Sequence, residues 1–313
     1  MITIYKTNVS EKKLRKIRRP IKGCWINMVC PTDDEIKEVS NLTGVKEHFI
    51  RYPLDLAEKA HIDVEDEDVL IVVDSPYTEM KGEQKIYTTM PFGMILVRDD
   101  YFITVSQVKI NSIEKLLSRY GNHIETGKKS RLVFSLLYDI SEEYIRYLTY
   151  INKDVEEFEH HMSKTMSNEE LLRIMNFEKS MVYFNASVKG NQVVLEKLYR
   201  GKTIKLYEED EDILEDTMIE NRQAIEMIQT YSEILNGIVD MFGTMVSNNL
   251  NSVMKLLTSI TLVISVPTMI ASFLGMNVEF PFNTSIVGFY SILAISIIVS
   301  IIVTIILKKR NML

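Results

Sequence analysis

Residues 256–278 read LLTSITLVISVPTMIASFLGMNV and carry no charged side chain. After the single acid Glu279, residues 280–307 carry none either. About 20 apolar residues in a helix, each adding 1.5 Å, cross the roughly 30 Å of hydrocarbon in a bilayer. The sequence therefore predicts two membrane-spanning helices near its C-terminal end. The short segment that joins them contains Gly275-Met276-Asn277.

Basic residues indicate how these helices are oriented. Lys255 directly precedes the uncharged run 256–278 and Lys308-Lys309-Arg310 follows the second run, while residues 275–285 contain no Lys or Arg. By the positive-inside rule, both termini are cytoplasmic. Residues 1–10 lack the apolar core of a signal peptide. We therefore expect a multi-pass protein of the cell (inner) membrane with a large cytoplasmic N-terminal part.

Hydroxyl side chains recur along the first predicted span at spacings of three, four, three and four residues, which places them on one side of a helix. These residues, here called the hydroxyl face, are Thr258, Thr261, Ser265, Thr268 and Ser272. Asn251 extends this face toward the cytoplasm. One interpretation is a packing contact between membrane helices, where Ser and Thr are common. The other is a surface that faces water, which would need a symmetric ring of subunits with this face inward.

The position of Gly275-Met276-Asn277, at the end of the first of two C-terminal spans, resembles the signature of the CorA-type magnesium transporters. Residues 247–258, SNNLNSVMKLLT, resemble the segment that leads into the pore helix of that family, and the basic tail is similar as well. Trp25-Ile26-Asn27 resembles a strand of its N-terminal domain. The resemblance covers most of the chain and is strongest in the last quarter.

This resemblance implies a divalent-cation channel rather than an enzyme, with Mg²⁺ as the expected ion and no bound cofactor. It implies a homo-oligomer, a pentamer, in the lipid bilayer, with the first span around the axis. The expected selectivity filter is Gly275, Met276 and Asn277, whose carboxamide can hydrogen-bond the waters of a hydrated ion. The expected pore-lining residues are Asn251, Met254, Leu257, Thr258, Thr261, Ser265 and Thr268. Among these, Met254 and Leu257 are expected to form an apolar constriction that gates by dewetting.

Alignment to the stalk of the family places Asp216 and Asp240 where acidic residues take part in a divalent-ion sensor between subunits. The chain departs from the family where an opposing acidic pair is expected, because Arg51-Tyr52 stands there. Arginine cannot provide an oxygen ligand to Mg²⁺. Either Arg51 pairs directly with Asp216 or Asp240 across the interface, or the site has moved.

The remaining patterns predict an α+β domain, a mixed sheet with flanking helices, followed by a long stalk helix and two transmembrane helices. Apolar runs at 23–29, 69–73, 93–97 and 101–105 predict strands, the last two joined as a hairpin, and Thr32 predicts a helix N-cap. Helices are expected from Ser130 onward, over about 168–199 and, with few breakers, over roughly 60 residues between Glu211 and Phe273.

The expected boundaries follow from these patterns. They are a cytoplasmic α/β domain at 1–125, a helical hairpin at 126–203, a stalk helix at 204–252, the first span at 253–274, an outer loop at 275–285, the second span at 286–307 and a basic tail at 308–313.

Composition limits the classes of partner. The net charge of −7 argues against nucleic acid and suits a cation ligand. Acidic runs at 63–68 and 208–216 fit either solvated loops or a field that concentrates divalent cations. The two cysteines and five histidines lack metal-ligand spacing, and we see no phosphate loop or catalytic triad.

Two other functions remain open. Transport of Zn²⁺, Co²⁺ or Ni²⁺ by a relative with the same tripeptide is the closer one, because a pore for hydrated ions selects weakly by ligand type. The second is a cytoplasmic scaffold or signalling module that the two helices only anchor. In that case the hydroxyl face is a buried packing contact and the protein conducts nothing.

Overall fold

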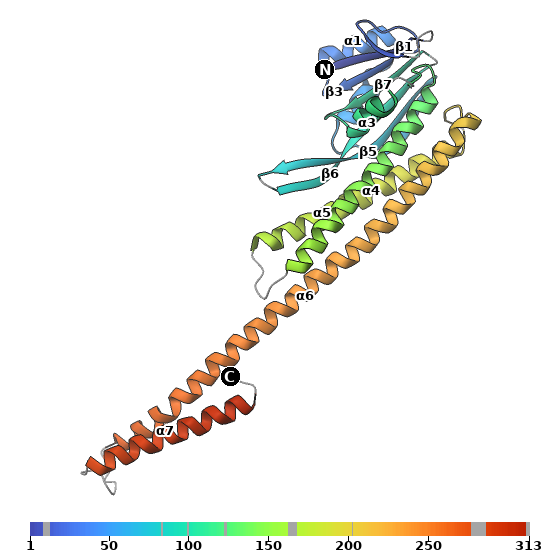
Figure 1. Cartoon of the computed structure of the whole chain (residues 1–313). Helices are drawn as coiled ribbons and strands as arrows, with labels where there is room; N and C mark the ends of the chain where they lie inside the picture. Colours follow the sequence, from blue (N-terminus) through green and yellow to red (C-terminus); the bar gives the residue numbers. More distant parts are fainter. Residues whose placement is uncertain are drawn as a thin grey trace. The chain divides into compact units, whose positions relative to one another are not determined.

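The computed structural model describes residues 1–8, 13–82, 84–98, 100–121, 124–161, 168–201, 203–276 and 286–310 (Figure 1). The chain divides into two compact units, Met1–Gly237 and Ile238–Leu313. The strands are β1 Ile2–Asn8, β2 Lys13–Ile17, β3 Trp25–Val29, β4 His61–Glu65, β5 Asp68–Lys81, β6 Gln84–Val97 and β7 Tyr101–Ser106. The helices are α1 Asp33–Thr43, α2 Glu47–Arg51, the 3₁₀ helix η1 Tyr52–Leu54, α3 Asn111–Tyr120, α4 Lys129–His161, α5 Asn168–Tyr199, α6 Glu208–Leu274 and α7 Ile286–Lys309.

The first unit is built on a mixed seven-stranded sheet in the order β2-β1-β3-β7-β6-β5-β4, in which only β3 and β7 pair in parallel. The hairpin predicted across residues 98–100 is confirmed, since β6 and β7 pair from Val97 and Tyr101 onward. The strand predicted at 23–29 begins only at Trp25, because Gly23 has a φ of 74°, which is not extended backbone. The sequence patterns did not predict β1, β2 and β4.

Helices cover both faces of this sheet. One face packs on α1 and α2 through a core that includes Ile26, Leu70 and Ile36. The other face packs on α4 and α5, whose buried residues include Tyr144 and Phe184. Full burial of each such side chain contributes about 1.5–3 kcal/mol. The predicted sheet with flanking helices is confirmed.

Local signals place the helix ends. Thr32 is the N-cap of α1, and a complete capping box joins it to Glu35. The two helices predicted from Ser130 onward and over 168–199 are α4 and α5. At the end of α5, Gly201 has a φ of 70° and donates its N–H to the carbonyl of Leu198 at 3.0 Å.

The half-buried acid Asp74 lies where α4 and α5 cover β5. Both backbone groups of Asp74 bond to the Asn191 side chain, at 2.9 Å and 2.8 Å, and the Tyr144 hydroxyl donates to the Asp74 carbonyl at 3.0 Å. Burial raises the pKa of the Asp74 carboxyl, and a hydrogen bond from Ser187 only partly opposes this. The folded state therefore favours the protonated acid.

Asp74→Asn is expected to raise the melting temperature of the detergent-solubilised protein at neutral pH. The pKa of Asp74 in the folded protein lies above its ordinary value of 3.8. The folded state therefore keeps the full contribution of the protonated acid below pH 3.8, and the protein loses this stability as the pH rises through the folded pKa. Asn cannot ionise, so the free energy of unfolding of the variant changes less between pH 4 and pH 8 than that of the wild type. Each 1 kcal/mol gained in that free energy raises the melting temperature by about 2–4 °C. Glu79→Gln, an exposed acid on the same strand, is the matched control. An unchanged melting profile for Asp74→Asn would contradict the assignment.

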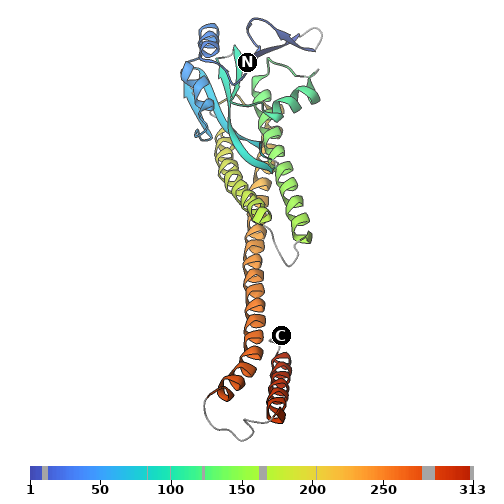
Figure 2. The same ribbon diagram turned by 90° about the vertical axis from the view of Figure 1, so that its left-hand side faces the viewer.

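The second unit contains the end of α6 and all of α7, which run side by side in Figures 1 and 2. The prediction of one helix of roughly 60 residues is confirmed, because α6 is continuous over 67 residues. Pro267 lies inside α6, and Figure 2 shows the last turns of this helix bending. Proline removes one backbone hydrogen bond without ending a helix when neighbouring groups compensate.

Candidate functional site

Among the residues that the structure describes, two helices are long and apolar enough to cross a bilayer. The relevant windows of α6 and α7 have mean hydropathies of 1.9 and 2.7. Only 6% and 11% of these windows are buried inside the protein, whereas a core helix of a soluble protein is mostly covered. Such exposed apolar surface is stable in lipid and not in water.

One side of α6 lies against α7. Ser259 is fully buried, and Val263, Val266, Ile270 and Leu274 on the same side are more covered than their neighbours. On α7 the buried residues are Gly288, Ser296 and Leu307. Small residues at such a contact let two membrane helices approach closely.

The hydroxyl face lies on the other side of α6. At 100° per residue, its mean direction is about 160° from that of the side that meets α7. All five of its residues are exposed in the single chain. An open groove of about 660 Å³ contains four of them, Thr261, Ser265, Thr268 and Ser272. The hydroxyl face is therefore not a contact with the chain's own second span.

Three of these hydroxyls are oriented by their own helix. Thr261 Oγ1 donates to the Leu257 carbonyl at 2.8 Å, Ser265 Oγ to the Leu262 carbonyl at 3.0 Å, and Thr268 Oγ1 to the Ile264 carbonyl at 2.9 Å. Each hydroxyl has one hydrogen and two lone pairs. The oxygens therefore remain free to accept further hydrogen bonds.

The N-terminal extension of the hydroxyl face along α6 is also exposed. Met254 and Leu257 are 52% and 57% exposed, and Asn251 is exposed as well. Counted at 100° per residue, Met254 lies within about 10° of the centre of the hydroxyl face, and Asn251 and Leu257 lie about 50–70° to either side. These three expected residues therefore continue the same surface.

The expected selectivity filter begins where α6 ends. Gly275 N–H donates to the Ala271 carbonyl at 2.9 Å, and Met276 N–H to the Phe273 carbonyl at 3.4 Å. A Cβ on Gly275 would lie 3.3 Å from the Ala271 oxygen, so a larger residue would crowd this turn. Gly275 and Met276 thus close the helix, and Asn277 lies outside the described residues.

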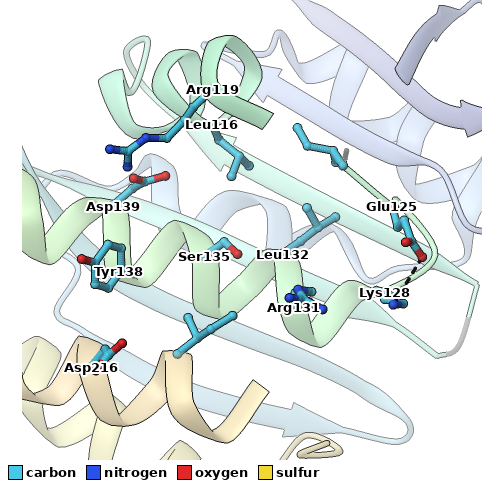
Figure 3. Close-up of a pocket in the computed structure, with 12 residues that line it drawn as sticks. Leu116, Arg119, Glu125, Lys128, Arg131, Leu132, Ser135, Tyr138, Asp139 and Asp216 are labelled. Carbon is cyan, nitrogen blue, oxygen red and sulfur yellow. Dashed lines mark ion pairs between the residues drawn. The ribbon is translucent and has the colours of Figure 1, made fainter. Parts of the chain in front are cut away.

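Asp216, one of the two expected regulatory residues, lines a pocket of about 720 Å³ between α3, α4 and the first turns of α6 (Figure 3). Across from it lies Tyr138 of α4, while Lys128 and Arg131 lie at the other end of the pocket. Burial raises the pKa of Tyr138, and three nearby carboxylates, including Asp216, raise it further. Acids therefore gather near the Asp216 end of the pocket, where Arg119 also lies.

The other carboxylates at this end were not predicted. Glu142 and Glu220 are the remaining neighbours of Tyr138, and burial followed by repulsion from Glu142 and Asp216 raises the pKa of Glu220. The available signal was spacing, because Glu220 follows Asp216 by one helical turn on a predicted helix. The sequence did not show which face of α4 lies opposite Asp216 and Glu220.

Asp139 adds a buried acid to the same pocket. It is 2% exposed, and its Oδ1 pairs with Lys115 Nζ at 3.1 Å. Its Oδ2 has no hydrogen-bond partner within the described ranges, and burial raises the pKa of the carboxyl. Lys115 also pairs with Glu142, so the cation is shared between two acids.

The structure does not bring Asp216 and Asp240 together. They are 24 residues apart (240 − 216) on the same helix, more than six turns. In the part of the chain that the structure describes, no group of three His, Cys, Asp or Glu side chains is arranged to hold a metal ion.

Arg51 has partners in its own chain. Its guanidinium donates to Asp33 at 2.7 Å and to Glu47 at 3.3 Å. These hydrogen bonds raise the pKa of Arg51. Pairing with Asp216 or Asp240 of another copy would have to compete with these two carboxylates.

Comparison with known proteins agrees with this architecture. Two curated relatives named "Cobalt/magnesium transport protein CorA" come from Methanocaldococcus jannaschii, 27% identical over 97% of this chain and 96% of the relative, and Thermotoga maritima, 24% identical over 92% and 82%. The solved structure of the M. jannaschii CorA magnesium transporter shares the fold, with a TM-score of 0.85 over 100% of this chain and 99% of that chain at 24% identity. The family described as CorA-like Mg²⁺ transporter protein matches residues 22–309. The chain therefore belongs to the CorA-like Mg²⁺ transporter family.

Proposed function

We propose that this protein is a membrane-potential-driven channel for hydrated divalent cations, with Mg²⁺ as the main ion. The observation that carries the proposal is the exposed hydroxyl face of α6, opposite its contact with α7. Polar side chains on the exposed side of an apolar helix are costly in lipid. A ring of identical subunits, a pentamer by family resemblance, removes this cost by turning the hydroxyl face toward a shared aqueous axis.

Neutral oxygens suit a hydrated dication. Mg²⁺ releases its waters reluctantly, so a pore that binds the waters conducts faster than one that removes them. Asn277 carboxamides at the outer mouth, and Thr268, Thr261 and Asn251 below, provide such oxygens. Neither predicted span contains a carboxylate, which avoids trapping the ion.

The driving force is electrical. Two positive charges moving inward across 100 mV release about 4.6 kcal/mol, which corresponds to more than a thousandfold accumulation at equilibrium. Because accumulation on this scale would be excessive, the pore must be able to close. We assign closure to the apolar level of Met254 and Leu257, which excludes water when the ring narrows.

The proposed topology follows the basic residues. Both termini are cytoplasmic, the α/β domain, helical hairpin and stalk helix lie inside, and residues 275–285 form the outer loop. Lys308, Lys309 and Arg310 after the second span support this orientation.

Regulation by cytoplasmic divalent ions is proposed at Asp216, with Asp240 as a second position. Asp216 and Asp139 line the pocket, and Glu142 and Glu220 act on the same Tyr138 as Asp216 does, so this group of acids supports attraction of a cation. The missing ligands come from a neighbouring copy. Because Arg51 stands where the family has acids, closure on Mg²⁺ is expected to be weaker than in relatives with the acidic pair.

The test is ion uptake by purified protein in liposomes under an inside-negative potential, followed with a Mg²⁺-sensitive dye and repeated for Co²⁺, Ni²⁺ and Zn²⁺. We expect Mg²⁺ uptake that grows with the potential and stops when an ionophore collapses it. Co²⁺ uptake is expected as well, since relatives are named for cobalt and magnesium transport. Liposomes that take up no divalent ion would support the scaffold alternative.

A further inference from the structure

The two edge strands of the sheet carry opposite charges. β2 forms one edge and β4 forms the other. The exposed basic residues of β2 and of the segment that follows it are Lys13, Arg15, Lys16, Arg18 and Arg19, and residues 12–22 contain no acid. β4 contains Asp63 and Glu65 and leads into the acidic turn at 66–67, and residues 61–68 contain no Lys or Arg. One sheet therefore has a basic edge and an acidic edge.

Charges on edge strands commonly keep sheets from pairing with one another. A single sign on both edges would serve that purpose. Opposite signs act differently, because like charges directly opposite each other repel and unlike charges attract. Pairing of β2 with β2, or of β4 with β4, is disfavoured, and only β2 beside β4 of another copy remains favourable.

The backbone of β2 is open on its outer side. Met1 exchanges both backbone hydrogen bonds with Val29 at the end of β3, at 2.9 Å and 3.1 Å. Such bonds alternate in direction along an antiparallel strand, which fixes the residues of β1 that face β2. Followed through the register of β1 with β2, this alternation points the N–H and C=O of Leu14 and Lys16 away from the sheet.

The backbone of β4 is open in the same way. Glu65 and Asp68 flank a two-residue turn and lie opposite each other, and residues in that position exchange backbone hydrogen bonds. By the same alternation, the N–H and C=O of Ile62 and Val64 point away from β5. Each edge can therefore accept one more strand.

β4 of a second copy fits the β2 edge in direction. Five of the six strand pairings are antiparallel, so β2 and β4 run in opposite directions within the sheet. A copy whose strands keep the same direction therefore brings its β4 antiparallel to β2. The register that places Leu14 opposite Val64 joins the outward backbone groups of the two strands. The charged pairs in this register are Arg15 with Asp63 and Lys13 with Glu65.

The charged side chains of both strands lie on the same face of the sheet. Ile4 and Leu70 belong to the core beneath α1 and α2, and they lie in register with Ile17 of β2 and Asp63 of β4. Because side chains alternate between the faces of a strand, all members of the two charged pairs share this face. Pairing of the two edges therefore sets basic side chains beside acidic ones.

We propose that β2 of one subunit lies edge to edge and antiparallel with β4 of the next subunit in the ring, with Arg15 opposite Asp63. Asp63 has no ion-pair partner within the ranges that the structure describes, whereas Glu65 already pairs with Lys46 and His48. A contact between two different surfaces of identical copies is heterologous, and it generates a ring when the rotation closes. The inference rests on the ring of subunits in the proposed function and adds a contact outside the membrane spans that holds the ring together.

The test is disulfide trapping of the full-length protein in membranes. Leu14→Cys/Val64→Cys is made in a Cys30→Ser background, and Cys24 is buried. Within one copy the two positions are six strand spacings of about 4.8 Å apart, about 29 Å, which no disulfide spans. Between paired copies they are about 5.5 Å apart, within disulfide range. We expect mild oxidation to give a ladder of covalent products that ends at the size of the native oligomer, and neither single-cysteine variant to give one.

Charge exchange tests why the strands pair. Arg15→Asp or Asp63→Arg, added to the cysteine pair, is expected to slow crosslinking about tenfold at low salt, because each places like charges opposite each other. The exchanged pair Arg15→Asp/Asp63→Arg is expected to return to within about twofold of the starting rate. Lys189→Asp, at an exposed position of α5, changes the net charge as Arg15→Asp does and is expected to leave the rate unchanged.

The inference is overturned if protein that is oligomeric by size gives no covalent dimer, if the ladder continues beyond the native oligomer, or if the exchanged pair stays slow. Mg²⁺ uptake by the wild type in liposomes is a separate readout for the proposed function. Normal uptake without the crosslink removes the contact and leaves the channel, whereas the crosslink without uptake supports the contact and removes the channel.

Discussion

Asn277→Ala is expected to lower Mg²⁺ uptake into liposomes about a hundredfold. In a five-membered ring the substitution removes five carboxamides that hydrogen-bond the waters of the entering ion. At about 0.5 kcal/mol for each bond, the lower end of the usual range, the loss is about 2.5 kcal/mol, close to a factor of 100. The measurement is the initial rate of dye-reported uptake at a fixed potential.

Two further variants make the Asn277 result specific. Asn277→Gln keeps the carboxamide one methylene further out and is expected to retain part of the activity. Asn236→Ala, at an exposed position of α6, is expected to transport as the wild type does. Uptake by Asn277→Ala within twofold of wild type would contradict the assignment of Asn277 to the ion path.

Met254→Ser/Leu257→Ser is expected to produce a channel that leaks. Both side chains are exposed on the extension of the hydroxyl face. A narrow apolar ring loses its water and stops ions, whereas hydroxyls keep the ring wet. Resting Mg²⁺ conductance at low potential is expected to rise about tenfold or more, which corresponds to removing at least about 1.4 kcal/mol from the barrier.

Leu256→Ser is the control for the leak. Leu256 is also exposed, at 49%, but lies about 160° from the centre of the hydroxyl face. It is expected to leave resting conductance near the wild-type value. A double variant with unchanged or lower resting conductance, at normal surface expression, would contradict an apolar gate at this level.

Much of the fold was readable from the sequence because its signals are local. The long stalk helix was predicted because few helix-breaking residues lie between Glu211 and Phe273, and α6 runs through that whole range. Among the missed strands, β1 (ITIYKTN) carries the β-branched residues typical of a strand, whereas β2 does not. In β2, KLRKI at the edge of the sheet reads as a charged segment, because edge strands expose their side chains and favour charges.

The site could be predicted only in part, because sequence patterns report local structure and not which helix faces pack together. Spacing alone grouped the five residues of the hydroxyl face, and resemblance identified the family, which is confirmed. Spacing could not show that this face lies opposite the α7 contact, or that Glu142 of α4 lies near Asp216 and Glu220 of α6. These depend on which helix faces pack together. The roles proposed for Asn277, Asp216 and Asp240 remain predictions.

The central claim is that the hydroxyl face lines water, and thiol accessibility tests it most directly. Single cysteines are placed at 259–272 of α6 in a Cys30→Ser background and treated in membranes with a water-soluble, membrane-impermeant thiol reagent. Cys24 stays in place, because it is buried and burial raises the pKa of its thiol. We predict rapid modification at 261, 265, 268 and 272, with little at 259, 263, 266 and 270. Equal reactivity all round the helix, or protection of the first group, would contradict a wet axis at this face.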